Sequence, residues 1–242
     1  MKKYNGFYLM GNYPDKDTFI KTAVKGLEHF DFLEVGIPFS DPNADGDVIS
    51  DAAQTLLDRN CTFSDISESI KTIRKSIPVE KDIYIMTYAN IIYNMEIPAF
   101  NTFCKENGVK GLILPDVPFC EKEFFAPLGL DPQIKLINFM TPESTTESID
   151  VAAEASENFI YFVSMRGITG TDFNLDKETM EKIDYAKSRS KVPVVTGFGI
   201  KSKDSAAKAM EHSDGFIIGT ALIEALNTGG YEKYAEFVDG LF

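Results

Sequence analysis

The chain has 242 residues, of which 44% are hydrophobic and 25% charged, as in an ordinary soluble globular protein. Its 24 Lys and Arg against 37 Asp and Glu give a net charge of -13, which argues against nucleic acid and anionic membranes as partners. No apolar run approaches the ~20 residues of a membrane span, and the N-terminus enters a strand too early for a signal peptide. We therefore expect one cytoplasmic domain that covers residues 1–242.

Eight short apolar runs follow one another along the chain, and they have the composition of buried strands. They cover Phe7–Met10, Phe32–Ile37, Ile83–Met86, Gly111–Leu114, Lys135–Phe139, Ile160–Val163, Val192–Val195 and Gly215–Ile218. Candidate helices lie between them, at Asp15–His29, Ser64–Ser76, Ile97–Asn107, Glu143–Ser156, Lys177–Ser190 and Ser202–Glu211. Strand and helix alternation predicts an α/β fold, a (β/α)8 TIM barrel with its active site at the C-terminal strand ends. A doubly wound open sheet is the alternative, because alternation does not prove closure.

Three helix starts have recognisable signals. Thr141 is an expected N-cap before Pro142, and Ser202 is an expected N-cap of the following helix. Gly219 and Thr220 follow the last strand and open a further helix. These signals place helices directly after strands, as a barrel requires.

The most informative segment is 34–46, EVGIPFSDPNADG, which joins an apolar strand to an acidic loop. Strand side chains alternate between two faces, so Glu34 points away from the apolar face and toward the inside of the barrel. A buried carboxylate is costly unless it is paired or neutral, so the segment predicts a site that contains Glu34 and Asp45. An ion pair with a neighbouring strand is the structural alternative.

Glycine-rich loops after the seventh and eighth strands predict a phosphate site. The segment Gly197–Ile200 follows one strand and Gly219–Thr220 follows the other, and glycine lets backbone N–H groups approach an anion. The long loop 164–175 after the sixth strand has the composition of a lid, and Gly170 is a further phosphate donor. A surface loop without function is the alternative for this segment.

Three aromatic residues, Tyr8, Tyr161 and Phe198, fall on or after the first, sixth and seventh strands, where a flat apolar ligand can lie. Packing in the core is the alternative. The remaining reactive side chains point to no site: Cys61, Cys104 and Cys120 are widely spaced and read as reduced thiols. His29 and His212 lie near expected helix ends and read as surface or capping residues, so no metal site is expected.

These motifs, in this order, resemble the tryptophan synthase alpha subunit family over nearly the whole chain. The match is most specific in segment 34–46 and continues in segments 8–15, 88–90, 115–118, 167–170 and 197–200. The resemblance implies a (β/α)8 lyase that cleaves indole-3-glycerol phosphate to indole and glyceraldehyde 3-phosphate by a retro-aldol step. It also implies a β subunit as partner. Two copies of each subunit would form an αββα heterotetramer, in which the β subunit makes L-tryptophan from indole. No cofactor is expected in this chain, and pyridoxal phosphate is expected in the partner.

The resemblance also implies residue roles. Glu34 protonates C3 of the indole ring and then accepts the glycerol hydroxyl proton, and Asp45 interacts with the indole N–H. The other implied positions are Gly170, Gly199, Gly219 and Thr220 for phosphate, Tyr8, Tyr161 and Phe198 for the indole pocket, Thr169 for the lid, and Pro38, Asp41 and Asn90 for the partner interface. These roles agree with the positions of the two carboxyl groups. We expect the apolar strand to raise the pKa of Glu34, which suits a general acid, and the polar loop to keep Asp45 ionised.

The chain departs from the family pattern at several positions. Asp47 replaces a common Pro and adds a negative charge that we expect to raise the pKa of Asp45. Met165 and Arg166 change the lid, and Gly11 and Asn12 replace a common Ala-Gly pair. Because the chain starts almost at its first strand, we expect no N-terminal helix at the barrel bottom and a larger contribution of the partner to stability.

Three other functions stay open at this point. A phosphosugar isomerase or epimerase would use the same phosphate end, although the strand-end lysines or metal-binding histidines typical of such enzymes are absent. A non-catalytic activator of a β subunit would explain the lid departures. A stand-alone indole-releasing lyase would use identical chemistry.

Overall fold

The computed structural model describes residues 3–118, 127–163, 176–197 and 199–242. Its described strands are β1 Gly6–Met10, β2 Phe32–Gly36, β3 Asp82–Met86, β4 Val109–Ile113, β5 Lys135–Leu136, β6 Asn138–Met140, β7 Ile160–Val163, β8 Val194–Gly197 and β9 Gly215–Ile218. They form one parallel sheet in the order β5-β4-β3-β2-β1-β9-β8-β7-β6. This order places chain neighbours side by side, as successive right-handed crossovers do.

The sheet closes on itself at β5 and β6. These two strands lie at opposite ends of the strand order, yet only Ile137 separates them in the chain. Lys135–Leu136 pairs with β4, Asn138–Met140 pairs with β7, and the amide of Ile137 donates to Leu112 O at 2.9 Å. The two pieces are therefore one interrupted barrel strand, the predicted (β/α)8 barrel is confirmed, and the open-sheet alternative is wrong.

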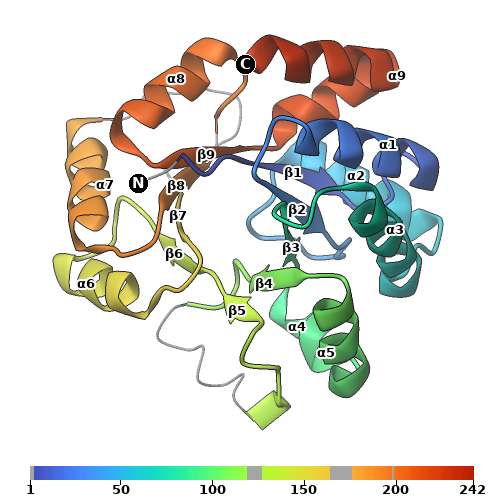
Figure 1. The fold of residues 1–242 in the computed structure, drawn as a ribbon, viewed down its shortest axis with the longest axis horizontal. Helices are drawn as coiled ribbons and strands as arrows, with labels where there is room; N and C mark the ends of the chain where they lie inside the picture. Colours follow the sequence, from blue (N-terminus) through green and yellow to red (C-terminus); the bar gives the residue numbers. More distant parts are fainter. Residues whose placement is uncertain (1–2, 119–126, 164–175, 198) are drawn as a thin grey trace.

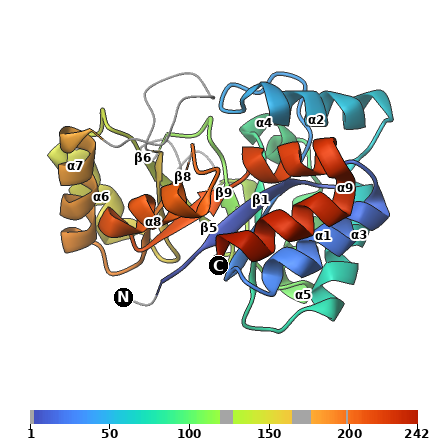
Figure 2. The same ribbon diagram turned by 90° about the horizontal axis from the view of Figure 1, so that it is seen from above.

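Helices surround the strands as a ring (Figure 1). They are α1 Lys16–Leu27, α2 Asp47–Asp58, α3 Phe63–Ser76, α4 Ala89–Tyr93, α5 Ile97–Glu106, α6 Thr146–Ala155, α7 Lys177–Arg189, α8 Lys203–His212 and α9 Thr220–Leu241. In the view from above, α2 and α4 lie together at one end of the barrel, where the chain leaves β2 and β3 (Figure 2). No helix in the described part of the chain is long and apolar enough to cross a membrane.

Helix starts follow the capping signals with one exception. Ser202 caps α8 in a capping box with Ser205, as predicted. The predicted N-cap Thr141 is wrong, because Ser144 closes a turn on Thr141 and the helix begins after Thr145, whose side chain accepts from Ser148 N. Local side-chain bonds of this kind compete with helix formation.

The barrel separates two apolar layers. Outward side chains of the strands, such as Leu33 and Val35, join the helices in a large outer core. Inward side chains, such as Phe32, Tyr161 and Val195, fill the barrel interior, where α2 adds Leu56. The predicted alternation in β2 is therefore confirmed, with Leu33, Val35 and Ile37 outside.

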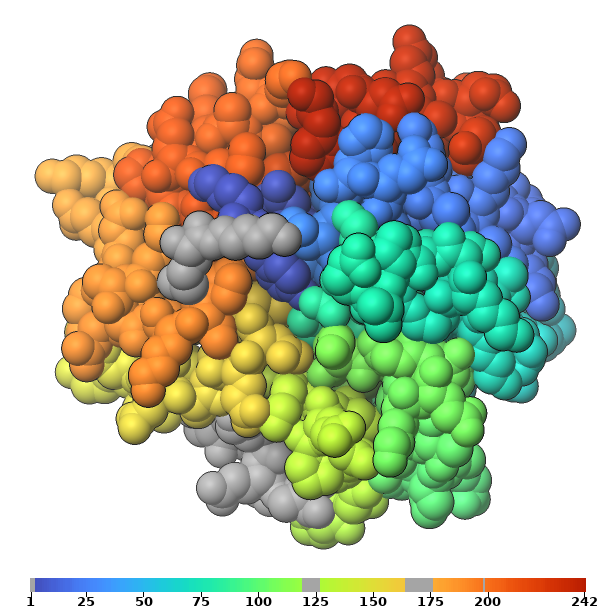
Figure 3. Space-filling model, in the orientation of Figure 1, coloured from blue at the N-terminus to red at the C-terminus, as the bar shows by residue number. Residues whose placement is uncertain are grey.

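Aromatic side chains fill the end of the barrel where the strands begin. The Tyr4 ring stacks on Phe32 at 4.7 Å, and its hydroxyl donates to Asp82 Oδ2 at 2.8 Å and lies 3.0 Å from the hydroxyl of Tyr84. The space-filling view shows the first described residues, in dark blue, at the centre of this face among elements from both halves of the chain (Figure 3). Tyr4 therefore helps to fill this end of the barrel.

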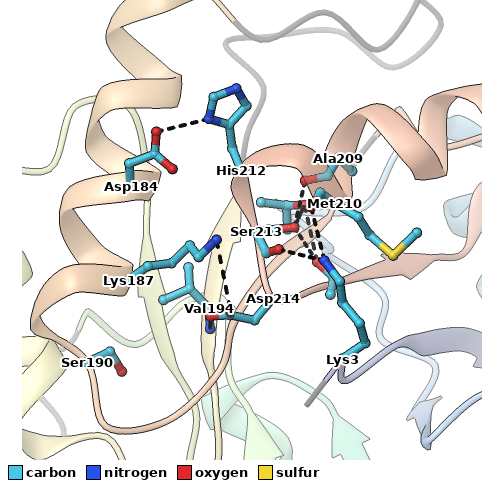
Figure 4. A network of polar contacts seen from close by, with 12 residues as sticks. Lys3, Asp184, Lys187, Ser190, Val194, Ala209, Met210, His212, Ser213 and Asp214 are labelled. Carbon is cyan, nitrogen blue, oxygen red and sulfur yellow. Dashed lines mark hydrogen bonds and ion pairs between the residues drawn. The ribbon is translucent and has the colours of Figure 1, made fainter. Parts of the chain in front are cut away.

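Polar contacts join α7, α8 and the N-terminal segment (Figure 4). His212 Nδ1 lies 3.0 Å from Asp184 Oδ2, Lys187 lies 3.8 Å from Asp214, and Lys3 donates to Met210 O at 3.0 Å. His212 ends α8, as its predicted capping role requires. His29 similarly lies 3.0 Å from Asp239 of α9, so both histidines hold outer helices together.

Candidate active site

Glu34 lies inside the barrel, in the middle of β2. It is 1% exposed, it is paired in register with Tyr8 of β1 and Tyr84 of β3, and its Oε2 has no hydrogen-bond partner among the described residues. Burial, together with the negative charge of Asp45, raises the pKa of Glu34 from 4.5 to about 8. The ion-pair alternative has no support, because no described cation bonds this carboxyl. Glu34 is therefore largely protonated at neutral pH and can donate a proton.

Asp45 lies in the loop between β2 and α2 and is held by a tyrosine from the loop after β3. The hydroxyl of Tyr88 donates to Asp45 Oδ2 at 3.0 Å and accepts from the amide of Ala44 at 3.3 Å. The Tyr88 ring also stacks on Phe39 of the same loop, with ring centres 4.7 Å apart. Burial raises the pKa of Asp45, and the Tyr88 hydrogen bond opposes the rise. This bond favours the ionised form of Asp45.

The raised pKa of Glu34 predicts a loss of stability with rising pH. The unfolded carboxyl ionises near 4.5 and the folded one near 8, so the free energy of unfolding falls across this interval by up to about 5 kcal/mol. Glu34→Gln lacks this group, so its stability relative to wild type rises by about 3 to 4 kcal/mol between about pH 5 and about pH 8. Urea unfolding of both proteins at the two pH values measures this difference, and an equal offset at both would contradict the prediction.

Two tyrosines predicted for the ligand pocket lie beside these carboxylates. The pKa values of Tyr8 and Tyr161 are both raised, first by burial and then by the charges of Glu34 and Asp45. Phe139 stacks on Tyr161 with ring centres 5.2 Å apart, an aromatic contact that the sequence analysis did not predict. Its position on the predicted fifth strand was the available signal. Phe198 lies outside the described residues.

Glycines make the space for these rings. A Cβ on Gly36 would lie 2.1 Å from the Tyr8 hydroxyl oxygen, and one on Gly197 would lie 2.4 Å from the Tyr161 ring. Gly197 was predicted in a loop after the strand, but it is the last residue of β8, paired with Val163. Its role in the structure is close packing against Tyr161.

The remaining predicted phosphate positions gather at the ends of β8 and β9, which are neighbours in the sheet. Gly219 is the N-cap of α9 and has no side-chain acceptor for the first-turn amides. A Cβ on Gly219 would lie 3.1 Å from Cβ of Tyr8, and Gly199 has φ +75, which favours glycine. Amides of a helix N-terminus suit an anion. Gly170 and the lid residues Thr169, Met165 and Arg166 lie outside the described residues.

Side-chain types that bind metals, and thiols, also occur among the described residues. No group of three or more His, Cys, Asp or Glu that could hold a metal occurs in the described ranges. Cys61 and Cys104 are free thiols, and burial raises the pKa of both. Cys120 lies outside the described residues. The arrangement suits acid–base chemistry on an apolar ligand with an anionic end.

Comparisons with known proteins agree with this geometry. A family model described as tryptophan synthase alpha chain matches residues 4–238. The tryptophan synthase alpha chain of Bacillus anthracis is 35% identical over 206 residues, 85% of this chain and 79% of that protein. The chain belongs to the tryptophan synthase alpha chain family. Its activity is therefore that of a carbon–carbon lyase, which cleaves indole-3-glycerol phosphate in tryptophan biosynthesis.

Solved structures are also similar. A protein from Aquifex aeolicus has a TM-score of 0.88 and 31% identity, covering 99% of this chain and 92% of that one. A chain from the tryptophan synthase a2b2 complex of Pyrococcus furiosus has a TM-score of 0.87 and 27% identity, covering 100% and 99%. A tryptophan synthase chain of Mycobacterium tuberculosis has a TM-score of 0.87 and 29% identity, covering 99% of this chain and 91% of that one.

Departures from the alpha chain family have structural explanations at two positions. Asn12 has φ 64, a left-handed conformation that Asn tolerates better than most residues and that suits the Gly common in the family. Asp47 is the exposed first residue of α2, where the helix dipole favours a negative charge. The expectation that Asp47 raises the pKa of Asp45 is wrong in its cause, because burial produces the rise.

The three residues predicted to face the alpha chain's partner differ in exposure. Asp41 and Asn90 are exposed, whereas Pro38 is buried. Asp41 accepts a hydrogen bond from Ser40 at 2.5 Å, and Asn90 of α4 accepts one from Asn94, the C-cap of that helix. Asp41 and Asn90 therefore have polar groups at the surface, whereas Pro38 is covered, and the interface role of all three stays a prediction.

One residue of this site was missed as a functional residue. Tyr88 had no predicted role beyond its place in the family segment 88–90, although its hydroxyl is the group that contacts Asp45. The signal in the sequence was an aromatic residue at the end of a strand that adjoins β2. Which atom it contacts depended on the loop conformation.

Proposed function

We propose that Glu34 and Asp45 carry the cleavage of indole-3-glycerol phosphate. Glu34 donates its proton to C3 of the indole ring, which makes the bond from C3 to the glycerol chain breakable. The resulting carboxylate takes the proton of the adjacent glycerol hydroxyl, which becomes the aldehyde of glyceraldehyde 3-phosphate as the bond breaks. The bonding electrons return to the ring and release indole. The single observation that carries this proposal is the buried Glu34 carboxyl with a pKa of about 8 beside Asp45.

Asp45 supplies negative charge where the indole ring becomes positive. Its carboxylate accepts the indole N–H, and a fixed charge in a partly buried site stabilises a developing cation more strongly than it would in water. The Tyr88 hydrogen bond supports this role because it favours the ionised form. Glu34 and Asp45 thus act in opposite protonation states, a division of roles that environment imposes on paired carboxylates.

The substrate has an apolar end and an anionic end, and the site has residues for both. Tyr8, Tyr161 and Phe198 line the indole pocket, and Gly170, Gly199, Gly219 and Thr220 hold the phosphate. Thr169 belongs to the lid. Support comes from the raised pKa of the two tyrosines beside the carboxylates and from the uncapped N-terminus of α9 close to Tyr8.

The chain works as one domain of residues 1–242 with a tryptophan synthase β subunit in an α2β2 complex. Asp41 and Asn90 contact the partner, and Pro38 supports the contacting loop. The similar chain of the Pyrococcus furiosus a2b2 complex supports this assembly. The partner carries pyridoxal phosphate, and this chain needs no cofactor of its own. A cytoplasmic location fits this biosynthetic activity.

Indole release from indole-3-glycerol phosphate tests the proposal. We expect the pure chain to release indole slowly and to release it faster when a β subunit is added. Release that the β subunit does not change would favour the stand-alone lyase over the partnered one. Absence of indole under both conditions would contradict the proposed activity, and turnover of a triose or pentose phosphate would then favour the isomerase alternative.

A further inference from the structure

Asp116 makes an unusual contact with the start of α4. Both of its carboxylate oxygens accept the amide of Ala89, at 3.1 and 3.0 Å. Asp116 comes from the turn after β4, in which the amide of Val117 donates to Leu114 O at 3.1 Å. The N-cap of α4 is Tyr88, whose side chain makes no capping bond. A carboxylate from the neighbouring strand end therefore replaces the missing cap.

The residue before this amide is the one that holds Asp45. The peptide group that joins Tyr88 to Ala89 carries the N–H that Asp116 accepts, so the bond fixes the backbone of Tyr88. On its other side, the Tyr88 hydroxyl donates to Asp45 at 3.0 Å and accepts from Ala44 N at 3.3 Å. A chain of hydrogen bonds thus runs from the loop after β4, through the loop after β3, to the loop after β2.

We propose that Asp116 is a positioning residue for Asp45, acting through Tyr88, in the reaction proposed above. Asp116 does not touch the substrate. It fixes the Tyr88 backbone so that the phenol reaches Asp45 at hydrogen-bond distance. The inference rests on the proposed role of Asp45.

The groups around Asp45 explain why the position of Tyr88 affects the pKa of Asp45. Glu34 of β2, Tyr8 of β1, Tyr161 of β7 and Tyr88 interact electrostatically with Asp45. Among the described residues, Tyr88 alone of these four donates a hydrogen bond to it. Burial raises the pKa of Asp45, and the Tyr88 bond is the opposing contribution. When Tyr88 is displaced, the pKa of Asp45 rises further and the ionised form is lost at a higher pH.

Two substitutions remove the same bond from opposite ends. Asp116→Ala removes the acceptor. Ala89→Pro removes the donor, and it fits the fold because proline is favoured at the first position of a helix. Tyr88 has φ -109 and ψ 151, a conformation that a residue before proline adopts readily. Tyr88→Phe removes the phenol hydroxyl itself.

The measurement is the pH profile of indole release by the α chain in its α2β2 complex. We expect Asp116→Ala, Ala89→Pro and Tyr88→Phe each to move the acidic limb upward by about one pH unit, a tenfold change in the Asp45 equilibrium. We expect kcat to fall about tenfold with little change in KM. Asp116→Asn keeps one acceptor oxygen and should restore most of the profile. In the Tyr88→Phe background, Asp116→Ala should cause no further shift.

Asp15→Ala is the matched control for a structural role. Asp15 also accepts a first-turn amide, that of Thr18 at 3.0 Å, but it caps α1 on the outside of the barrel. The Asp15→Ala substitution should lower the melting temperature and leave the acidic limb of the pH profile in place. If Asp116→Ala and Ala89→Pro behave like Asp15→Ala while Tyr88→Phe moves the limb, the inference is overturned and the proposed function stands. If Asp45→Asn keeps full activity, the proposed function itself has failed.

Discussion

Glu34→Gln is expected to lower kcat for indole release by a factor of about 10² to 10⁴, the usual contribution of a general acid–base group. Glutamine has nearly the same shape, but its amide neither donates an acidic proton to C3 nor accepts the hydroxyl proton. The loss should appear in kcat more than in KM, because the proton transfer occurs in the transition state. Indole release at saturating substrate, with and without the β subunit, measures it.

The control for this substitution is a Glu→Gln change outside the barrel. Glu154 is exposed on α6, so Glu154→Gln should keep the wild-type rate. Glu34→Gln should also stay folded, because it removes a buried carboxyl whose Oε2 has no hydrogen-bond partner among the described residues. A folded Glu34→Gln protein with full activity would show that another group moves the proton.

Asp45→Asn is expected to lower kcat by about 10² to 10³, the usual effect of removing one group that stabilises transition-state charge. It should also move the alkaline limb of the pH profile to lower pH. The negative charge of Asp45 contributes to the Glu34 pKa of about 8, and activity needs protonated Glu34. Without that charge, Glu34 loses its proton at a lower pH. The pH dependence of kcat/KM measures both effects.

Asp47→Asn is the matched control in the same segment. Asp47 lies two residues further along the chain, exposed at the start of α2. We expect no change in kcat and no movement of either limb. An equal shift of the alkaline limb in both variants would mean that net charge, and not the position of Asp45 beside Glu34, sets the pKa of Glu34.

The barrel strands were predictable because their residues encode them locally. Short apolar runs with β-branched residues marked all eight strands within about two residues of their observed ends, and alternation in β2 predicted that Glu34 points inward. The closure of the barrel was not encoded by a local run of residues. It depends on the interrupted strand around Ile137, whose two halves pair with different neighbours.

Two helices were missed for different reasons. The α2 sequence does carry a helical pattern, since Val48, Ala52 and Leu56 recur every four residues. Only the preceding acidic loop was predicted from the sequence, with no helix after it. The α4 helix has five residues, too few for periodicity to indicate a helix. The carboxylate that accepts its first amide, that of Asp116, comes from another strand end.

The sequence by itself determined the residue types of the site and the end of the barrel at which they gather, since each lies in a strand or in the segment that follows one. Only the tertiary structure decided which of them touch. Tyr88 reaches Asp45 across 43 residues and Asp116 reaches Ala89 across 27. These contacts depend on the register of neighbouring strands and on loop conformations, both of which are fixed by packing across the whole barrel. The pKa of Glu34 was decided in the same way, because burial is a property of everything that surrounds the carboxyl.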